Sequence, residues 1–147
     1  MGDQSFHILL IEDDDGHAML VEKGFRSSGA RGTIDRVRDG VEGVAYVKRD
    51  GAYADRPRPQ LILLDLKLPR MDGHQVLRIL KGDDDFNTIP IVVLTTSDAD
   101  NDVHQACSLH ANSYLVKPVN FAKFRELIGA VTSYWGAWNR LPLEAES

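Results

Sequence analysis

Charged side chains follow three short apolar runs of this chain, at the point where each run ends. They are Glu12 and Asp13 after residues 8–11, Asp65 after residues 61–64, and Lys117 after residues 113–116. A carboxylate at the end of a buried strand is costly to ionise unless a cation compensates it. The acids and the lysine therefore predict one site that is assembled from three separated parts of the sequence.

The residue types in this set indicate metal-assisted phosphoryl chemistry. Three carboxylates in one pocket repel one another unless a cation is bound, and a set without His or Cys favours a hard divalent ion, Mg²⁺ or Mn²⁺. Asp65 would be a nucleophile toward a phosphoryl donor, since carboxylates form aspartyl phosphates. A fourth apolar run ends in Thr95, Thr96 and Ser97. The metal, Lys117 and Thr95 would neutralise the oxygens of the transferred group.

The alternation of apolar runs and amphipathic stretches predicts five β–α units. Strands are expected at 8–11, 33–37, 61–64, 91–94 and 113–116, and helices at 15–28, 39–49, 73–82, 98–110 and 120–134. This pattern indicates an α/β fold, a parallel sheet with helices on both faces. Ligands of such sheets bind beyond the carboxyl ends of the strands. If the strand order is 2-1-3-4-5, the ends of the first and third strands lie about 5 Å apart.

Composition limits the classes of function. The 147 residues suit one domain, and the formal net charge of −5 without a basic stripe argues against nucleic acid as the main partner. No apolar run approaches the length of a membrane span, and Met1–Phe6 lacks the pattern of a signal peptide. Cys107 is the only cysteine, which excludes an internal disulfide. We expect a cytoplasmic protein without a membrane partner.

Several residues outside the charged set are expected to have structural roles. Val103, Ala106 and Cys107 follow helical spacing, which predicts that Cys107 is a core residue rather than a reactive thiol. The histidines show no metal-ligand spacing and are expected at the surface or in packing; they are His7, His17, His74, His104 and His110.

Two segments are candidates for contact with a partner. Residues 49–59 form a polar connection that is longer than usual between a helix and a strand. The last helix is expected to break near Gly136. Its apolar residues follow helical spacing on one face and are expected chiefly in the core; they are Phe121, Phe124, Ile128, Val131 and Trp135. A domain over 1–134 would then be followed by a tail over 135–147 that contains Trp138, Leu141 and Leu143. This tail either folds back onto the domain or, as we favour, completes a homodimer interface.

Over residues 6–133 the chain resembles a response-regulator receiver domain of two-component signalling. The resemblance rests on Glu12-Asp13, Asp65, Leu68-Pro69-x-Met71-Asp72-Gly73, Thr95 and Lys117-Pro118, in the order and spacing of the family. It implies a flavodoxin-like (βα)5 sheet with strand order 2-1-3-4-5. One mild departure is Glu12, which stands where many members of the family have Asp.

The resemblance also implies a role for each matching residue. Asp65 would be the phosphoacceptor, and Asp13, Asp65 and the carbonyl of Lys67 would hold the metal, with Glu12 acting through water. Thr95 and Tyr114 would form a switch pair, although Tyr114 alone could be an ordinary strand aromatic. The phosphate-binding set would be Thr95, Thr96 and Lys117, and the Lys117–Pro118 bond would be cis.

The function implied is that of a single-domain response regulator. It would accept a phosphoryl group from a sensor histidine kinase in a Mg²⁺-dependent reaction, and signal by conformational change and protein–protein binding. A narrower resemblance links the chain to regulators that are paired with bacterial and cyanobacterial phytochrome kinases. It rests on the 49–59 loop, Thr95-Thr96-Ser97 and Tyr134-Trp135, and it implies a bacteriophytochrome as the phosphodonor and a homodimer.

Two other functions fit the sequence less well. A hydrolase that uses Asp65 as nucleophile would need a second acid two residues later, where Lys67 stands. A nucleotide or flavin binder would need a glycine-rich loop after the first strand, where residues 12–15 are acidic and repel phosphate. We therefore expect no enzymatic activity beyond self-catalysed phosphorylation and dephosphorylation.

Overall fold

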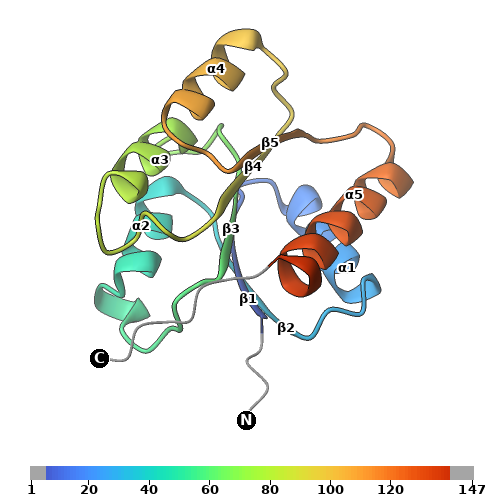
Figure 1. The fold of residues 1–147 in the computed structure, drawn as a ribbon, viewed down its shortest axis with the longest axis horizontal. Coiled ribbons are helices and arrows are strands. Elements are labelled where there is room, and N and C mark those ends of the chain that lie inside the picture. The colour runs from blue at the N-terminus through green and yellow to red at the C-terminus, as the bar shows by residue number, and fades with distance from the viewer. Residues whose placement is uncertain (1–5, 140–147) are drawn as a thin grey trace.

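The computed structural model describes residues 6–139, which form a parallel sheet covered by helices on both faces (Figure 1). The strands are β1 (Phe6–Ile11), β2 (Gly32–Val37), β3 (Leu61–Leu64), β4 (Ile91–Thr95) and β5 (Ser113–Val116). The α-helices are α1 (Asp15–Ser27), α2 (Gly40–Lys48), α3 (Gly73–Lys81), α4 (Asp100–Ser108) and α5 (Phe121–Ser133). A 3₁₀-helix, η1 (Gly51–Tyr53), lies in the connection after α2, and a π-helix, η2 (Tyr134–Trp138), follows α5.

The sheet has the strand order β2-β1-β3-β4-β5, and every neighbouring pair is parallel. Helices α1 and α5 cover one face, and α2, α3 and α4 cover the other (Figure 1). The predicted fold class and strand order are confirmed. This topology brings the carboxyl ends of β1, β3, β4 and β5 to one edge of the sheet. Within residues 6–139, no helix is both long enough and apolar enough to cross a membrane.

The core consists of two apolar layers, one on each face of the sheet. Leu9 and Ile11 of β1 face the layer under α2 and α3, whereas Ile8 and Leu10 face the layer under α1 and α5. This alternation follows from the two-residue period of a strand. All residues of β3 and β4 are buried, as strands covered on both faces require.

Two apolar residues that were expected in the core lie at the surface. Cys107 is exposed, whereas its neighbour Ala106 in α4 is fully buried. Because successive helical residues point about 100° apart, a narrow contact between α4 and the sheet buries only one of the two. Phe121 at the start of α5 is 71% exposed, while Phe124, one turn nearer the centre of the helix, is buried as predicted.

The segment that follows α5 differs from the prediction. The chain does not break near Gly136 but continues as η2 to Trp138. Gly136 packs directly on β1, where a Cβ atom would lie 2.9 Å from Cδ2 of Phe6, so this close approach requires glycine. Trp138 is 80% exposed. Leu141 and Leu143 lie outside the described residues.

Candidate functional site

The structure brings four of the predicted site residues together at the carboxyl edge of the sheet. Glu12 follows β1, Asp65 follows β3, Thr95 ends β4 and Lys117 follows β5. All four side chains are buried, although three of them carry ionisable groups. The charged groups must therefore compensate one another.

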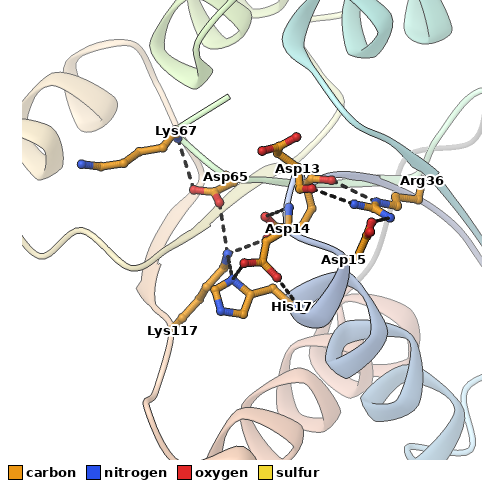
Figure 2. A network of polar contacts seen from close by, with 9 residues as sticks. Asp13, Asp14, Asp15, His17, Arg36, Asp65, Lys67 and Lys117 are labelled. Atoms are coloured by element: carbon orange, nitrogen blue, oxygen red, sulfur yellow. Dashed lines mark hydrogen bonds and ion pairs between the residues drawn. The ribbon is translucent and has the colours of Figure 1, made fainter. Parts of the chain in front are cut away.

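Lys117 is the centre of this cluster. Its Nζ atom donates to Oε1 of Glu12 at 2.5 Å and to Oδ2 of Asp65 at 3.1 Å, and it lies 2.9 Å from Nδ1 of His17 (Figure 2). An ammonium group has three protons and no lone pair, so these three neighbours satisfy it completely. The buried cation offsets the charge of the two buried carboxylates.

Asp65 is held in its ionised form. Burial acts to raise the pKa of this carboxyl, but the charge of Lys117 and hydrogen bonds from Thr95, Lys117 and Glu12 outweigh it, and the pKa lies below its usual value. The backbone N–H of Lys67 also donates to Oδ1 of Asp65 at 3.3 Å, while the Lys67 side chain points away from Asp65 (Figure 2). An ionised carboxylate is the form that can attack phosphorus.

Glu12 behaves differently from its neighbour. The pKa of Glu12 is raised to about 7. Burial and the charge of Asp65 raise it, and together they outweigh the hydrogen bond from Lys117, which lowers it. Its second oxygen, Oε2, accepts from the backbone N–H of Asp14 at 3.1 Å. Near neutral pH the cluster therefore keeps Asp65 ionised and allows Glu12 to hold a proton.

Asp13 is exposed at the mouth of the cluster, where it lines a cavity of about 490 Å³ together with Lys67 and Asp72. Within residues 6–139, no three His, Cys, Asp or Glu side chains are already arranged as a metal site. Glu12 and Asp65 turn toward Lys117 instead of converging with Asp13. The residues expected to hold the metal, Asp13, Asp65 and the carbonyl of Lys67, nevertheless offer only oxygen donors, and this donor set fits a hard divalent cation.

Arg36 of β2 fixes the loop that carries the two acids after β1. Its Nε donates to the carbonyl of Glu12 at 2.9 Å, and its Nη2 donates to the carbonyl of Asp13 at 3.1 Å. Its Nη1 forms an ion pair with Asp15 at 2.8 Å. One guanidinium group thus contacts three of the four residues in the acidic segment 12–15.

A tight turn follows Asp65. The backbone N–H of Gly73 donates to the carbonyl of Leu66 at 2.9 Å, and a Cβ atom at Gly73 would lie 2.5 Å from the carbonyl oxygen of Asp65. Asp72 caps α3 by accepting from the N–H of Gln75, whose side chain accepts from the N–H of Asp72. The turn and this capping box fix the start of α3 against the backbone of Asp65.

The predicted switch residues occupy different environments. Thr95 is fully buried beside Asp65, whereas Thr96 is exposed. The N–H of Ser97 donates to Oγ1 of Thr95 at 3.4 Å, and the hydroxyl of Tyr114 donates to the carbonyl of Ser97 at 2.9 Å. Ser97 therefore links the two members of the expected pair.

The expected cis bond before Pro118 is not observed. No peptide bond among residues 6–139 is cis, so the Lys117–Pro118 bond is trans. The trans form of an X–Pro bond is favoured by about 0.5–1 kcal/mol when nothing in the surroundings selects cis.

Sequence reasoning missed His17 and Arg36. His17 was expected at the surface or in packing, yet its ring reaches Lys117. The available signal was its position, one helical turn after Asp13 at the start of a helix that begins at the strand ends. For Arg36 the available signal was a positive charge near the end of β2, the strand beside β1. In the sheet, Arg36 pairs with Leu10 of β1.

Comparisons with known proteins identify similar regulatory proteins. A family model described as the response regulator receiver domain matches residues 8–129. The chain is 43% identical over 138 residues to the probable methanogenesis regulatory protein FilR2 of Methanothrix harundinacea, covering 93% of this chain and 88% of the relative. It is 39% identical over 128 residues to the response regulator Rcp1 of Synechocystis, covering 87% of each.

Solved structures of response regulators are also similar to this chain. The Mn²⁺-bound form of Rcp1 superposes with a TM-score of 0.89 and 38% identity, covering 93% of this chain and 99% of that one. The phosphorylated cyanobacterial phytochrome response regulator RcpA superposes with a TM-score of 0.91 and 35% identity, covering 95% of this chain and 99% of that one.

Proposed function

Because the chain belongs to the response regulator receiver domain family, we propose that it accepts a phosphoryl group on Asp65 from a sensor histidine kinase. An oxygen of Asp65 forms a bond to phosphorus while the bond from phosphorus to the kinase histidine breaks. The electron pair of the broken bond leaves with the imidazole. The observation that carries this proposal is the buried, ionised carboxylate of Asp65 in contact with Lys117.

Each residue around Asp65 has a separate role in the transfer of the phosphoryl group. Negative charge develops on the oxygens of the transferred group, and preorganised donors stabilise it best because they need not reorient. Lys117 supplies a point charge, and the hydroxyl of Thr95 supplies a hydrogen bond. The N–H of Lys67 keeps Oδ1 of Asp65 in place.

We propose that Asp13, Asp65 and the carbonyl of Lys67 hold the divalent ion, Mg²⁺ in the cell with Mn²⁺ able to replace it, and that Glu12 contacts it through water. Such an ion would supply positive charge that offsets the carboxylates and the transferred phosphoryl group. Support comes from the oxygen donors at the mouth of the cluster and from the relative Rcp1, whose structure holds Mn²⁺.

The signal would leave the site through Thr95, Ser97 and Tyr114. A phosphoryl group on Asp65 attracts the hydroxyl of Thr95, which now accepts from the N–H of Ser97. A shift of Ser97 disturbs its carbonyl, the acceptor of the Tyr114 hydroxyl. The surface formed by α4, β5 and α5 would change and bind a partner protein.

The kinase partner that we propose is a bacteriophytochrome-type light sensor. RcpA is described as a cyanobacterial phytochrome response regulator, and its structure superposes on 95% of this chain. The test is phosphotransfer from a phosphorylated phytochrome kinase, compared with a histidine kinase of another class. Faster transfer from the second kinase would contradict this choice of partner.

We also propose that the domain over 1–134 dimerises with the help of the segment 135–147. Tyr134 is 53% exposed and Trp138 is 80% exposed, so η2 presents large apolar side chains to solvent. Sedimentation velocity would compare the full chain with a chain ending at Tyr134 and with Trp138→Ala. We expect a dimer for the full chain and a shift to monomer in both variants; an unchanged dimer in both would contradict the role of this segment.

Labelling with a small phosphodonor tests the central proposal. Incubation with acetyl phosphate and Mg²⁺ should add one phosphoryl group to the native protein, measured by intact-protein mass spectrometry, and none to Asp65→Asn. Asp55→Asn, which changes an exposed aspartate of the 49–59 loop, is the matched control and should be labelled normally. Stoichiometric labelling of Asp65→Asn would overturn the assignment.

A further inference from the structure

His17 completes the hydrogen bonding of Lys117, although it lies outside the motif residues on which the resemblance rests. The ammonium of Lys117 is 1% exposed and has acceptors on Glu12, Asp65 and His17. The first two are carboxylates of the phosphoacceptor cluster. The third is an imidazole from α1, and it adds an acceptor without adding negative charge.

The contact with an ammonium fixes the tautomer of the ring. Lys117 can only donate, so Nδ1 of His17, at 2.9 Å from Nζ, must carry the lone pair, and the proton sits on Nε2. One competing partner lies close, because Oδ2 of Asp14 is 3.9 Å from the same nitrogen. A ring with its proton on Nδ1 could not accept from Lys117.

The surroundings hold the ring in this position. The backbone N–H of His17 donates to Oδ1 of Asp14 at 2.9 Å in the first turn of α1. The ring packs on Phe124 of α5, with 5.9 Å between centroids, and Phe124 is 1% exposed. The imidazole is therefore placed by two helices that contribute no other group to the cluster.

Building on the phosphoacceptor function proposed above, we propose that His17 is a positioning residue for phosphoryl transfer. Its neutral imidazole takes one N–H of Lys117 and Glu12 takes the second. The third N–H is thereby aimed at Oδ2 of Asp65 and, during transfer, at an oxygen of the incoming phosphoryl group. Without this acceptor, the flexible lysine side chain samples other directions and meets the developing charge less often.

Kinetics of phosphorylation by acetyl phosphate test this role. We expect His17→Ala to lower the rate constant at saturating Mg²⁺ and donor by about tenfold, the size of effect that one lost hydrogen bond in the transition state produces. Hydrolysis of the phosphorylated protein should slow by a similar factor, since Lys117 stabilises the same charge. The donor concentration at half-maximal rate and the affinity for Mg²⁺ should stay unchanged.

A conservative variant separates positioning from packing. In His17→Asn the amide oxygen lies close to the place of Nδ1 and can accept from Lys117, although the ring and its contact with Phe124 are lost. We expect His17→Asn to recover most of the native rate constant. His104→Ala, which removes an exposed histidine of α4, is the matched control and should behave as the native protein.

The tautomer gives a readout that does not depend on activity. Long-range ¹H–¹⁵N spectra of the native protein at about pH 8, above the usual histidine pKa, should show an unprotonated Nδ1 and a protonated Nε2 for His17. A protonated Nδ1 would overturn the proposal. So would equal rate constants for the native protein and His17→Ala, or an Asn variant as slow as the Ala variant. If the native protein is not labelled at all, the phosphoacceptor function itself fails, which is a separate result.

Discussion

Nζ of Lys117 lies 2.5 Å from Oε1 of Glu12, and the two side chains are only 1% and 2% exposed. Asp65 shares the same ammonium at 3.1 Å. Removing one partner from a buried ion pair leaves an uncompensated charge in a poorly solvated place, which costs more than the pair contributes. The lysine is therefore both part of the chemistry and a structural counterion.

The first prediction concerns this counterion. Lys117→Met should lower the free energy of unfolding in metal-free buffer by about 3 kcal/mol, because the buried, ionised Asp65 loses its cation and Glu12 loses its hydrogen-bond donor. Mg²⁺ should recover part of the loss, since an ion that binds only the folded state stabilises it. Urea unfolding with and without Mg²⁺ measures both effects.

Lys123→Met is the matched control, since Lys123 is exposed on α5. Its unfolding free energy should stay within about 0.5 kcal/mol of the native value. Equal stability of Lys117→Met and Lys123→Met would show that Lys117 does not compensate the acids.

The second prediction concerns the acidic loop and rests on the proposed metal site. Arg36→Gln should lower the affinity for Mn²⁺ by about tenfold, because groups that orient metal ligands commonly contribute that much. Arg36 holds the carbonyls of Glu12 and Asp13, so its loss frees the loop that presents the ligands. Isothermal titration calorimetry measures the affinity.

Arg38→Gln is a demanding control for this variant. Arg38 pairs with the same Oδ1 of Asp15 at 2.8 Å, but it is 57% exposed, against 18% for Arg36. Its removal changes the net charge by the same amount and should leave the affinity almost unchanged. Equal losses in the two variants would mean that charge, and not the hold on the loop, sets the affinity.

Much of this architecture could be predicted because the local signals agree with the fold. The runs that form β1, β3 and β4 are apolar on both faces, and every predicted strand and helix lies within two residues of its observed ends. The acids were found because charge at the end of an apolar run is unusual, and parallel strands bring such ends together. The positions of the acids in the sequence, together with the strand order, were sufficient to predict that they lie at one site.

What could not be predicted depends on how helices dock. His17 and Lys117 are 100 positions apart, and their contact depends on how α1 docks, because its first turn must reach the residue that follows β5. The exposure of Cys107 likewise depends on the angle at which α4 meets the sheet. The spacing of apolar residues within α4 does not determine that angle. The direction of Glu12, toward Lys117 rather than toward Asp13, follows from charge balance within the finished cluster.

The third prediction tests the packing of α1 on α5 with two glycines. A Cβ atom at Gly24 would lie 2.7 Å from Cβ of Ile128, so Gly24→Ala should lower the unfolding free energy by about 2 kcal/mol through overpacking. A Cβ atom at Gly129 meets nothing within 4 Å. Gly129→Ala should therefore raise the free energy by about 0.5–1 kcal/mol, since alanine loses less backbone entropy in a helix. Opposite shifts in urea midpoints are expected; shifts of the same sign would contradict the close contact.

The fourth prediction concerns pH and a buried histidine far from the phosphoacceptor. His7 is 5% exposed, with Nδ1 at 2.6 Å from Oγ1 of Thr33 and Nε2 at 2.7 Å from the hydroxyl of Tyr46. Burial lowers its pKa, and the charge of Arg56 adds to this, although Asp35 acts in the opposite direction. The folded state therefore binds fewer protons at His7 than the unfolded state does just below the usual pKa.

The sign of the stability change follows from this difference. The contribution of neutral His7 is fully present above the unfolded pKa of about 6.5 and is lost as pH falls toward the lower pKa of the folded state. The native protein should lose more unfolding free energy between about pH 7.5 and 5.5 than His7→Gln, which cannot titrate. Other titrating groups, Glu12 among them, are common to both proteins and cancel in the comparison. His104→Gln should retain the native pH dependence because His104 is exposed, and an identical pH dependence for His7→Gln would mean that burial does not hold His7 neutral.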